Sequence, residues 1–291
     1  ETAETEKFGS NLDMGIHVLS TFFTGTHGFN SKAQTKKLIE SLKAYDPDLI
    51  LTEEYTEVEV QNYTGSFCGF VLLNGSYDLH ALAQRLQQNY GIAIQSNHAE
   101  EMLDDPNGIV HDLMLNVPGA MVTISFLNEP IPDGEVESAA MHAEWEGAKL
   151  AASKHRAHLM IAVLPDTMPA HEAGLLYCRI LSVALEDAAV LAVYTSGTVL
   201  EPIQFCYNTE KSGNVLPLNN LIFVGTYERD GGMCGYTMGL DAFGKDELEI
   251  LDCKESPELI HRVLYMCADK MIHENKSAAW YITVDVDGTQ W

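Results

Sequence analysis

The stretch that decides the fold is "FCGFVLL" at residues 67–73, followed closely by "DLHALAQRLQQNYG" at 78–91. The first is a continuous apolar run of strand length, which is typical of a buried strand. In the second, Asp78 is a favoured N-cap, apolar residues recur at helical spacing, and Gly91 suits the end of a helix. Together they predict a strand followed by an amphipathic helix.

Segments toward the C-terminus extend this pair into a longer order. They are the strands 109–117 and 120–127 around the turn dipeptide Pro118-Gly119, a helix at 135–155 and a strand at 157–165. The order β-α-β-β-α-β over 67–165 is that of a ferredoxin-like, or split βαβ, unit. We therefore predict one such unit in this half of the domain.

The remainder of the chain repeats this order loosely. The predicted elements are a helix at 170–187, a strand at 189–195, a Pro- and Asn-rich connection at 201–219, a strand at 219–228, a turn at 229–232, a helix at 257–273 and a strand at 279–286. This order predicts an α+β fold, a tandem ferredoxin-like (split βαβ) sandwich with a mainly antiparallel sheet and halves at 67–165 and 157–291. An αβα sandwich is the alternative.

The N-terminal residues differ in character from this domain. Residues 1–13 are polar and predict a flexible tail. The segment 14–66 contains a strand, a helix and a second strand, which predicts a βαβ unit ahead of the α+β domain.

Charge and cysteine content limit the classes of partner and the compartment that are expected. With 42 acidic against 17 basic residues the formal net charge is −25, which disfavours a nucleic-acid partner and favours a basic protein partner. No apolar run has transmembrane length, so we expect no membrane partner. The six cysteines are scattered without a C-x-x-C motif, which indicates free thiols and predicts a cytoplasmic protein.

Several short blocks resemble a known family. They are "PIP" at 130–132, the segment containing Trp145, "HRAHLMIAVLP" at 155–165, "AVYTSGTVLEP" at 192–202 and "GYTMGLDAFGKDELEI" at 235–250. In order and spacing these blocks resemble the bacterial family known only as domain of unknown function 4261, over about residues 69–291. The resemblance implies a domain boundary near residue 67 and brings no activity, cofactor or catalytic residue.

Two histidines are candidate functional residues. In "HRAH", His155 ends a predicted helix and His158 begins a strand, so their rings need not face each other. A protonated histidine is favoured at a helix C-terminus, which gives His155 a structural reason to be there. No third ligand with suitable spacing is evident for a metal, and "HEAGL" at 171–175 lacks the second histidine of a zinc helix. We predict neither a metal nor a cofactor.

Other candidates come from the helix at 135–155 and from the segment at 235–251. Met141, Trp145, Ala148 and Ala152 are spaced for one helical face, so Trp145 is expected to pack on the sheet or to stack on a ligand. Thr237, Glu247 and Glu249 would line a pocket if their strand faced one. The alternation in "ELEIL" instead favours a solvated face for both acids.

Three functions are consistent with the sequence. The preferred hypothesis is a non-catalytic protein-binding or regulatory module with an acidic surface. An enzyme or small-molecule site near His155 and His158 is the alternative, and it requires those residues and Glu247 to converge on one pocket. A self-associating structural subunit, formed by extension of a sheet edge into a homo-oligomer, is the third.

Overall fold

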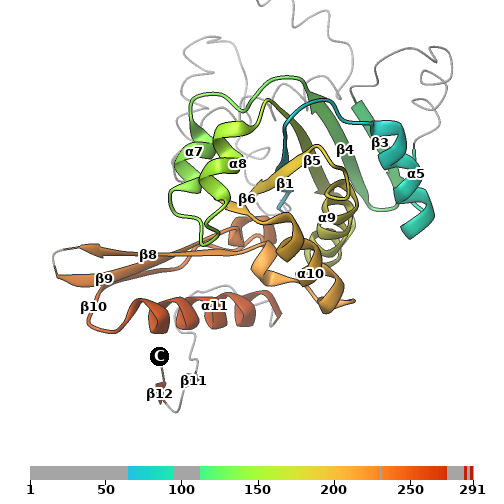
Figure 1. The fold of residues 1–291 in the computed structure, drawn as a ribbon. Coiled ribbons are helices and arrows are strands. Elements are labelled where there is room, and N and C mark those ends of the chain that lie inside the picture. Colours follow the sequence, from blue (N-terminus) through green and yellow to red (C-terminus); the bar gives the residue numbers. More distant parts are fainter. Residues whose placement is uncertain (1–64, 95–111, 230, 274–284, 287–288, 291) are drawn as a thin grey trace, which may run out of the picture. The chain divides into compact units, whose positions relative to one another are not determined.

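The computed structural model describes residues 65–94, 112–229, 231–273, 285–286 and 289–290 (Figure 1). The chain divides into two units, residues 1–62 and residues 63–291, and all described residues belong to the second. The predicted tail at 1–13, and the predicted βαβ segment except for its last two residues, therefore lie outside the described residues.

Seven strands form the main sheet, and every neighbouring pair in it is antiparallel. This confirms the prediction of an α+β fold with an antiparallel sheet. The strands are β1 (Phe67–Leu73), β2 (Ala93–Ile94), β3 (Asp112–Val117), β4 (Ala120–Leu127), β5 (Ala157–Pro165), β6 (Val190–Thr195) and β7 (Thr198–Leu200). Their order across the sheet is β2-β3-β4-β5-β1-β6-β7.

This order is not that of a ferredoxin-like unit. A split βαβ unit would place β1 between parallel strands β4 and β5, whereas here β4 and β5 are adjacent and antiparallel, with Leu127 opposite His158. The predicted helix at 135–155 is in fact two short helices, α7 (Glu135–Ala140) and α8 (Ala148–Lys154). One unbroken helix of that length would extend about 30 Å and carry the chain away from the end of β4. The break at 141–147 instead lets the chain return beside β4.

Helices pack on both faces of the main sheet (Figure 1). Alternate residues of β1 belong to different cores, because side chains of a strand alternate between its two faces. Phe67, Val71 and Leu73 enter the larger core with residues of α5 (Leu79–Tyr90), α9 (Ala170–Ala184) and α10 (Pro202–Ser212). Leu72 enters a smaller core with α7 and α8. The layering therefore corresponds to the αβα alternative.

The predicted ends of helix α5 are confirmed. The carboxylate of Asp78 accepts a hydrogen bond from the Ala81 N–H at 3.0 Å, and Gly91 adopts φ +67°, which a residue with a side chain rarely adopts. Leu79, Leu82 and Leu86 are buried as their spacing predicts. Tyr90, expected on the same stripe, is 44% exposed, and the Arg179 guanidinium lies 5.8 Å from its ring centroid.

A second, three-stranded antiparallel sheet carries the C-terminal helix. Its strands are β8 (Phe223–Arg229), β9 (Gly232–Met238) and β10 (Glu249–Cys253), in the order β10-β9-β8, and helix α11 (Pro257–His273) packs on it. The predicted hairpin is confirmed by the pairing of Arg229 with Gly232. A Cβ at Gly235 would lie 2.5 Å from Ile260 Cγ2, so the glycine is what lets α11 approach the sheet.

The predicted connection at 201–219 is wrong, because it contains helix α10 and the 3₁₀ helix η1 (Leu218–Asn220). Glu201 is the extended N-cap residue and Pro202 begins the helix, where the missing N–H of proline costs no hydrogen bond. At the C-terminus, β11 (Asp285–Val286) pairs with β12 (Thr289–Gln290). Most of the predicted strand at 279–286 lies outside the described residues.

Candidate functional site

His155 is buried, and both of its ring nitrogens bond to the backbone. The Ile131 N–H donates to Nε2 at 3.0 Å, so Nε2 carries no proton. Nδ1 lies at hydrogen-bond distance from the Ala152 carbonyl oxygen, so it must be the donor. The ring is therefore held as the neutral Nδ1–H tautomer at the end of α8. It has no nitrogen left for a metal or a substrate.

His158, on β5, also bonds to the connection that follows β4. Its Nδ1 lies 2.8 Å from the Glu129 carbonyl oxygen, and its ring meets the edge of the Phe70 ring at 5.6 Å between centroids. Burial lowers the pKa of His158, and the Glu129 carbonyl opposes this shift. The two histidines thus hold the segment at 129–131 from opposite ends. Their geometry explains a structural role.

Trp145 lies in the break between α7 and α8, so the predicted helical face is wrong. Met141 is 61% exposed, while Ala148 and Ala152 are buried. Trp145 packs against the smaller core, and its ring lies so close to Gly147 that a Cβ there would be 2.4 Å from a ring carbon. The indole therefore packs at the turn between the two helices.

Glu247 caps the 3₁₀ helix η2 (Leu240–Phe243) and bonds to Thr237. Its Oε1 accepts hydrogen bonds from the Gly239 N–H at 2.8 Å and the Leu240 N–H at 2.9 Å, and its Oε2 accepts from Thr237 Oγ1 at 2.6 Å. Thr237 Oγ1 in turn accepts from the Leu248 N–H at 2.8 Å. The carboxylate thus accepts the backbone N–H groups at the start of η2, as the side chain of an N-cap residue does.

Partial burial of the two carboxyl groups at this loop changes their titration. Desolvation raises the pKa of Glu247, and nearby Asp241 raises it further, while the Thr237 hydrogen bond opposes the rise. Desolvation also raises the pKa of Asp241. Glu249 does not belong to this loop. It is exposed on β10 opposite Tyr236, as the alternation in the sequence predicts.

The histidines and Glu247 do not converge on one pocket. His158 pairs with Leu72, whose side chain enters the smaller core. Phe243, in the loop capped by Glu247, packs edge-on against Phe67 at 5.1 Å, within the larger core. The two groups therefore belong to opposite faces of the main sheet. The geometric requirement of the enzyme hypothesis is not met by these residues.

Potential metal ligands and thiols are dispersed over the described part of the chain. Within the described ranges, no three His, Cys, Asp or Glu side chains gather as metal ligands would. All six cysteines are free. Burial raises the pKa of Cys68 to about 12 and also raises that of Cys178, which disfavours their reactive thiolate forms.

A groove on the surface lies between the end of α9 and helix α10, where the sequence indicated only a connection. Its volume is about 340 Å³, and its lining residues are Leu185, Pro202, Ile203, Cys206, Tyr207 and Glu210. Ile203 and Tyr207 are 78% and 53% exposed. With Glu210 they follow the i, i+4, i+7 spacing of one helical stripe. The opposite side of α10 is anchored by buried Phe205.

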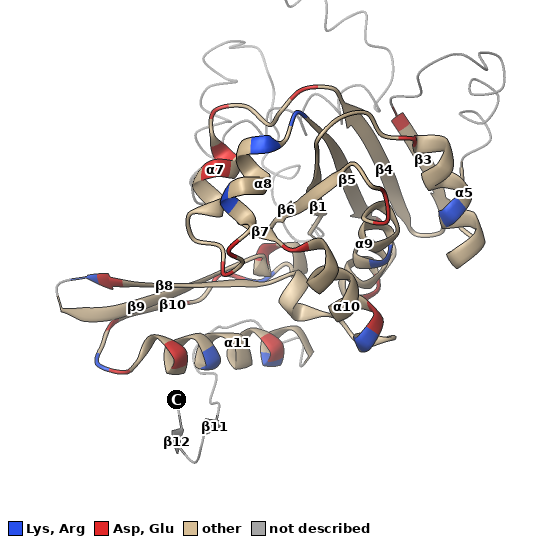
Figure 2. Cartoon of the chain, in the orientation of Figure 1, with Lys and Arg blue, Asp and Glu red and all other residues tan. Residues whose placement is uncertain are grey.

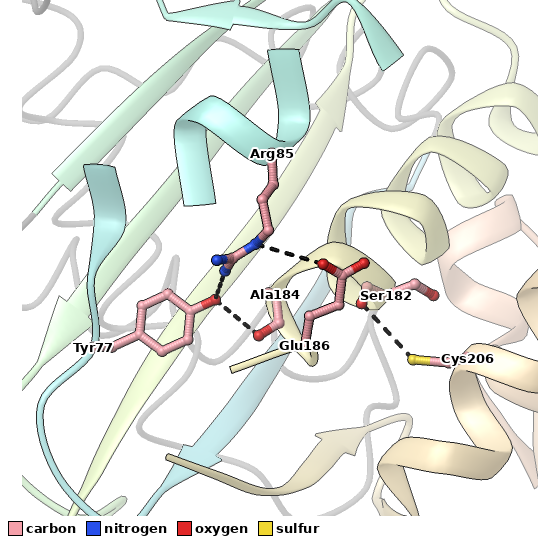
Figure 3. Close-up of polar contacts among 6 residues, drawn as sticks. All are labelled: Tyr77, Arg85, Ser182, Ala184, Glu186 and Cys206. Atoms are coloured by element: carbon pink, nitrogen blue, oxygen red, sulfur yellow. Dashed lines mark hydrogen bonds and ion pairs between the residues drawn. The ribbon is translucent and has the colours of Figure 1, made fainter. Parts of the chain in front are cut away.

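Two sets of polar contacts join the helices next to this groove (Figure 3). Tyr77 donates a hydrogen bond to the Ala184 carbonyl at 2.8 Å and accepts one from Arg85 at 3.2 Å. Arg85 Nε also lies 3.6 Å from Glu186 Oε2. Cys206 Sγ contacts the Ser182 carbonyl at 3.7 Å. The first set joins the Tyr77–Arg85 segment to the end of α9, and the contact of Cys206, which lines the groove, joins α10 to α9.

A row of aromatic side chains lies on one face of the three-stranded sheet, and the sequence analysis missed it. Tyr236 is 6.1 Å from Phe223 and 6.2 Å from Tyr227 between ring centroids. Its ring covers Gly225, where a Cβ would come within 2.5 Å of a ring carbon. Cys234 is completely buried. Alternation along paired strands would have predicted the row if the strand register had been known.

In Figure 2, lysine and arginine are spread over separate elements of the coloured chain instead of forming one basic stripe. Over the residues that were described, no helix has the length and apolarity needed to span a membrane.

Comparison with known proteins gives no family assignment. No protein-family model, curated protein or solved structure matches the chain. The resemblance to domain of unknown function 4261 therefore stays a prediction.

Proposed function

We propose that this chain is a non-catalytic protein-binding module whose acidic surface takes a basic protein partner. The single observation that carries the proposal is the exposed apolar stripe of α10, Ile203 and Tyr207, beside the acidic residue Glu210. Large apolar side chains that stand next to each other at a groove are typical of protein contacts. The candidate catalytic side chains favour the same conclusion, since His155 and Glu247 are occupied by backbone bonds.

The charge of the chain supports a basic partner. A net charge of −25 produces a long-range field that speeds encounter with a cationic protein and repels acidic ones. Such attraction is screened by salt, because the Debye length falls from about 10 Å at 0.1 M to about 3 Å at 1 M ionic strength. Binding of the partner should therefore weaken as salt is raised.

A second candidate function, self-association, is favoured by one observation. In the three-stranded sheet, β8 and β10 are the outer strands, so each has one side without a neighbouring strand in that sheet. Unpaired strand edges can pair with a second copy. Light scattering tests this directly, since a monomer at high protein concentration would remove it.

We also propose a reducing, cytoplasmic setting and membership of the bacterial family that the sequence resembles. The six free thiols, several of them buried, support the setting. The family membership rests on the sequence blocks alone.

Affinity capture at two salt concentrations tests the protein-binding function. The tagged chain is incubated with native lysate at about 0.05 M and about 0.5 M salt, and retained proteins are identified and then purified for calorimetry. We expect a basic protein that binds in a fixed stoichiometry and more weakly at the higher salt. The absence of a stoichiometric partner at either concentration would contradict the proposal.

A further inference from the structure

We infer that the groove between α9 and α10 is the docking site for an amphipathic helix of the partner, with lysine or arginine beside its apolar residues. This inference rests on the proposed protein-binding function and assigns it a surface and a class of ligand. It follows from the shape, the exposed side chains and the charges of the groove.

The apolar part of the site matches the requirements of a docking helix. Ile203 and Tyr207 are one helical turn apart on α10, and Leu185 and Pro202 line the groove beside them. A partner helix that packs along α10 presents apolar residues at i, i+3, i+4 and i+7 to such a stripe.

The charges around the groove select basic residues in the partner. Glu210 lines the groove, and Glu201 is the N-cap residue of α10. Glu186 is close to the groove residue Cys206, because its charge adds to the rise in the Cys206 pKa that burial causes. Cations also lie nearby, and Arg179 donates hydrogen bonds to the Gly213 carbonyl at 3.1 Å and to Asn214 at 2.8 Å at the end of α10. Arg85 is paired with Glu186, and Lys211 Nζ lies 5.5 Å from the centroid of the Tyr207 ring. Among the residues that line the groove, Glu210 is the one with a charged side chain, so the lining itself is acidic and complements a basic helix.

The walls of the groove are formed before the partner arrives. Asn220 is 2% exposed and donates hydrogen bonds to the Phe205 carbonyl at 2.9 Å and to Thr209 Oγ1 at 3.0 Å. These bonds join η1, which contains Asn220, to the buried side of α10. Because α10 is anchored on that side, its exposed stripe is presented without rearrangement, which lowers the entropic cost of binding.

A synthetic helix of lysine and leucine serves as the probe. Its binding to the full chain is measured by fluorescence anisotropy, together with two matched peptides, one with serine for leucine and one with glutamate for lysine. We expect the lysine–leucine peptide to bind and both matched peptides to bind at least about tenfold more weakly.

Variants of the chain locate the site. The double variant Ile203→Ser, Tyr207→Ser should weaken the lysine–leucine peptide about tenfold or more, and Glu210→Lys should weaken it several-fold. Lys211→Gln should strengthen it. The matched control is Met141→Ser, Leu150→Ser, because these residues are similarly exposed, at 61% and 58%, on α7–α8. We expect this control to bind as the unmodified chain does.

The outcomes separate the docking site from the proposed function. If the lysine–leucine peptide binds equally to the α10 double variant and to the control, the groove is not the site, while an acidic binding module remains. If the lysine–serine peptide binds as tightly as the lysine–leucine peptide, charge alone drives binding and the inference is overturned. Failure of every basic peptide to bind overturns the docking site, and failure to capture any partner overturns the proposed function.

Discussion

Replacing Glu247 tests the structural role that its hydrogen bonds imply. Glu247→Ala would leave the Gly239 and Leu240 N–H groups and the Thr237 hydroxyl without their acceptor. A net hydrogen bond to a charged group contributes about 1.5–3 kcal/mol. The residue as a whole is exposed, although its carboxylate is partly desolvated, so water replaces part of this contribution. Loss of a comparable helix cap costs about 0.5–2 kcal/mol. We expect the free energy of unfolding to fall by about 1–2 kcal/mol.

The free energy of unfolding is measured by urea denaturation of the purified variants, with unfolding monitored by far-UV circular dichroism. Glu249→Ala is the matched control, since it removes an exposed acid two residues away without removing a cap, and should stay within about 0.5 kcal/mol of the unmodified chain. Equal free energies of unfolding for the Glu247 and Glu249 variants would refute the capping role.

The pH dependence of Glu247 has a defined sign. Because desolvation raises its pKa in the folded chain, the folded state binds more protons than the unfolded state between the two pKa values. The contribution of Glu247 to the free energy of unfolding is therefore largest below the unfolded pKa, about 4.3, and falls as pH rises through the folded pKa. Glu247→Gln should remove this dependence, and an unchanged pH profile would refute the assignment.

Four further tests of other parts of the structure use the same denaturation assay. His155→Gln keeps an acceptor for the Ile131 N–H, so it should lower the free energy of unfolding less than His155→Ala does. The alanine variant leaves that buried donor unpaired, at a cost of about 1–3 kcal/mol. Equal losses of free energy for the two variants would argue against the assigned bond. Since burial lowers the pKa of His158, the unfolded state binds more protons, and the free energy of unfolding should fall as pH drops below about 6.5; a His158→Gln variant with an unaltered profile would contradict this. Gly235→Val should cost about 1–3 kcal/mol by displacing α11, whereas Gly75→Ala, where a Cβ meets nothing within 4 Å, should be nearly neutral. Asn220→Asp removes the two donors that anchor α10 and should cost about 2 kcal/mol, so an unchanged midpoint would mean that these bonds do not hold the helix.

Local patterns predicted the elements whose ends have a short-range cause. The strand at Phe67–Leu73 and the helix at Leu79–Tyr90 appear with the predicted bounds, because an apolar run, Asp78 and Gly91 define them within a few residues. The helix at Pro257–His273 was also predicted correctly, from its apolar periodicity. Gly244, which ends η2, adopts φ +65°, a backbone conformation that favours glycine.

Helix α10 was missed because its sequence carries loop-like residues. Pro202 at its start, Asn208 within it and Asn220 beyond it suggested a connection. In the structure Pro202 occupies the first turn, and Asn220 is buried and bonded to the helix, an arrangement that depends on packing over a distance in the chain. The groove beside α10 therefore could not be predicted.

The strand order of the main sheet was also predicted wrongly, again because it depends on contacts between residues distant in the sequence. The pairing of β4 with β5 depends on a break between α7 and α8 that the helical spacing of Met141, Trp145, Ala148 and Ala152 concealed. The position of His155 at the end of a helix was predicted correctly, but its role there is to accept the Ile131 N–H and not to act as a protonated ring at a helix C-terminus. Its bond to Ile131 joins residues 24 positions apart and follows only from the tertiary structure.

Hydrogen exchange of the full chain with and without the lysine–leucine peptide tests the central claim most directly. The account predicts slower exchange in α10, at Pro202–Ser212, and at the end of α9, with exchange at Glu135–Lys154 and Phe223–Cys253 unchanged. Protection centred on the α7–α8 helices or on the three-stranded sheet, with α10 unaffected, would contradict it.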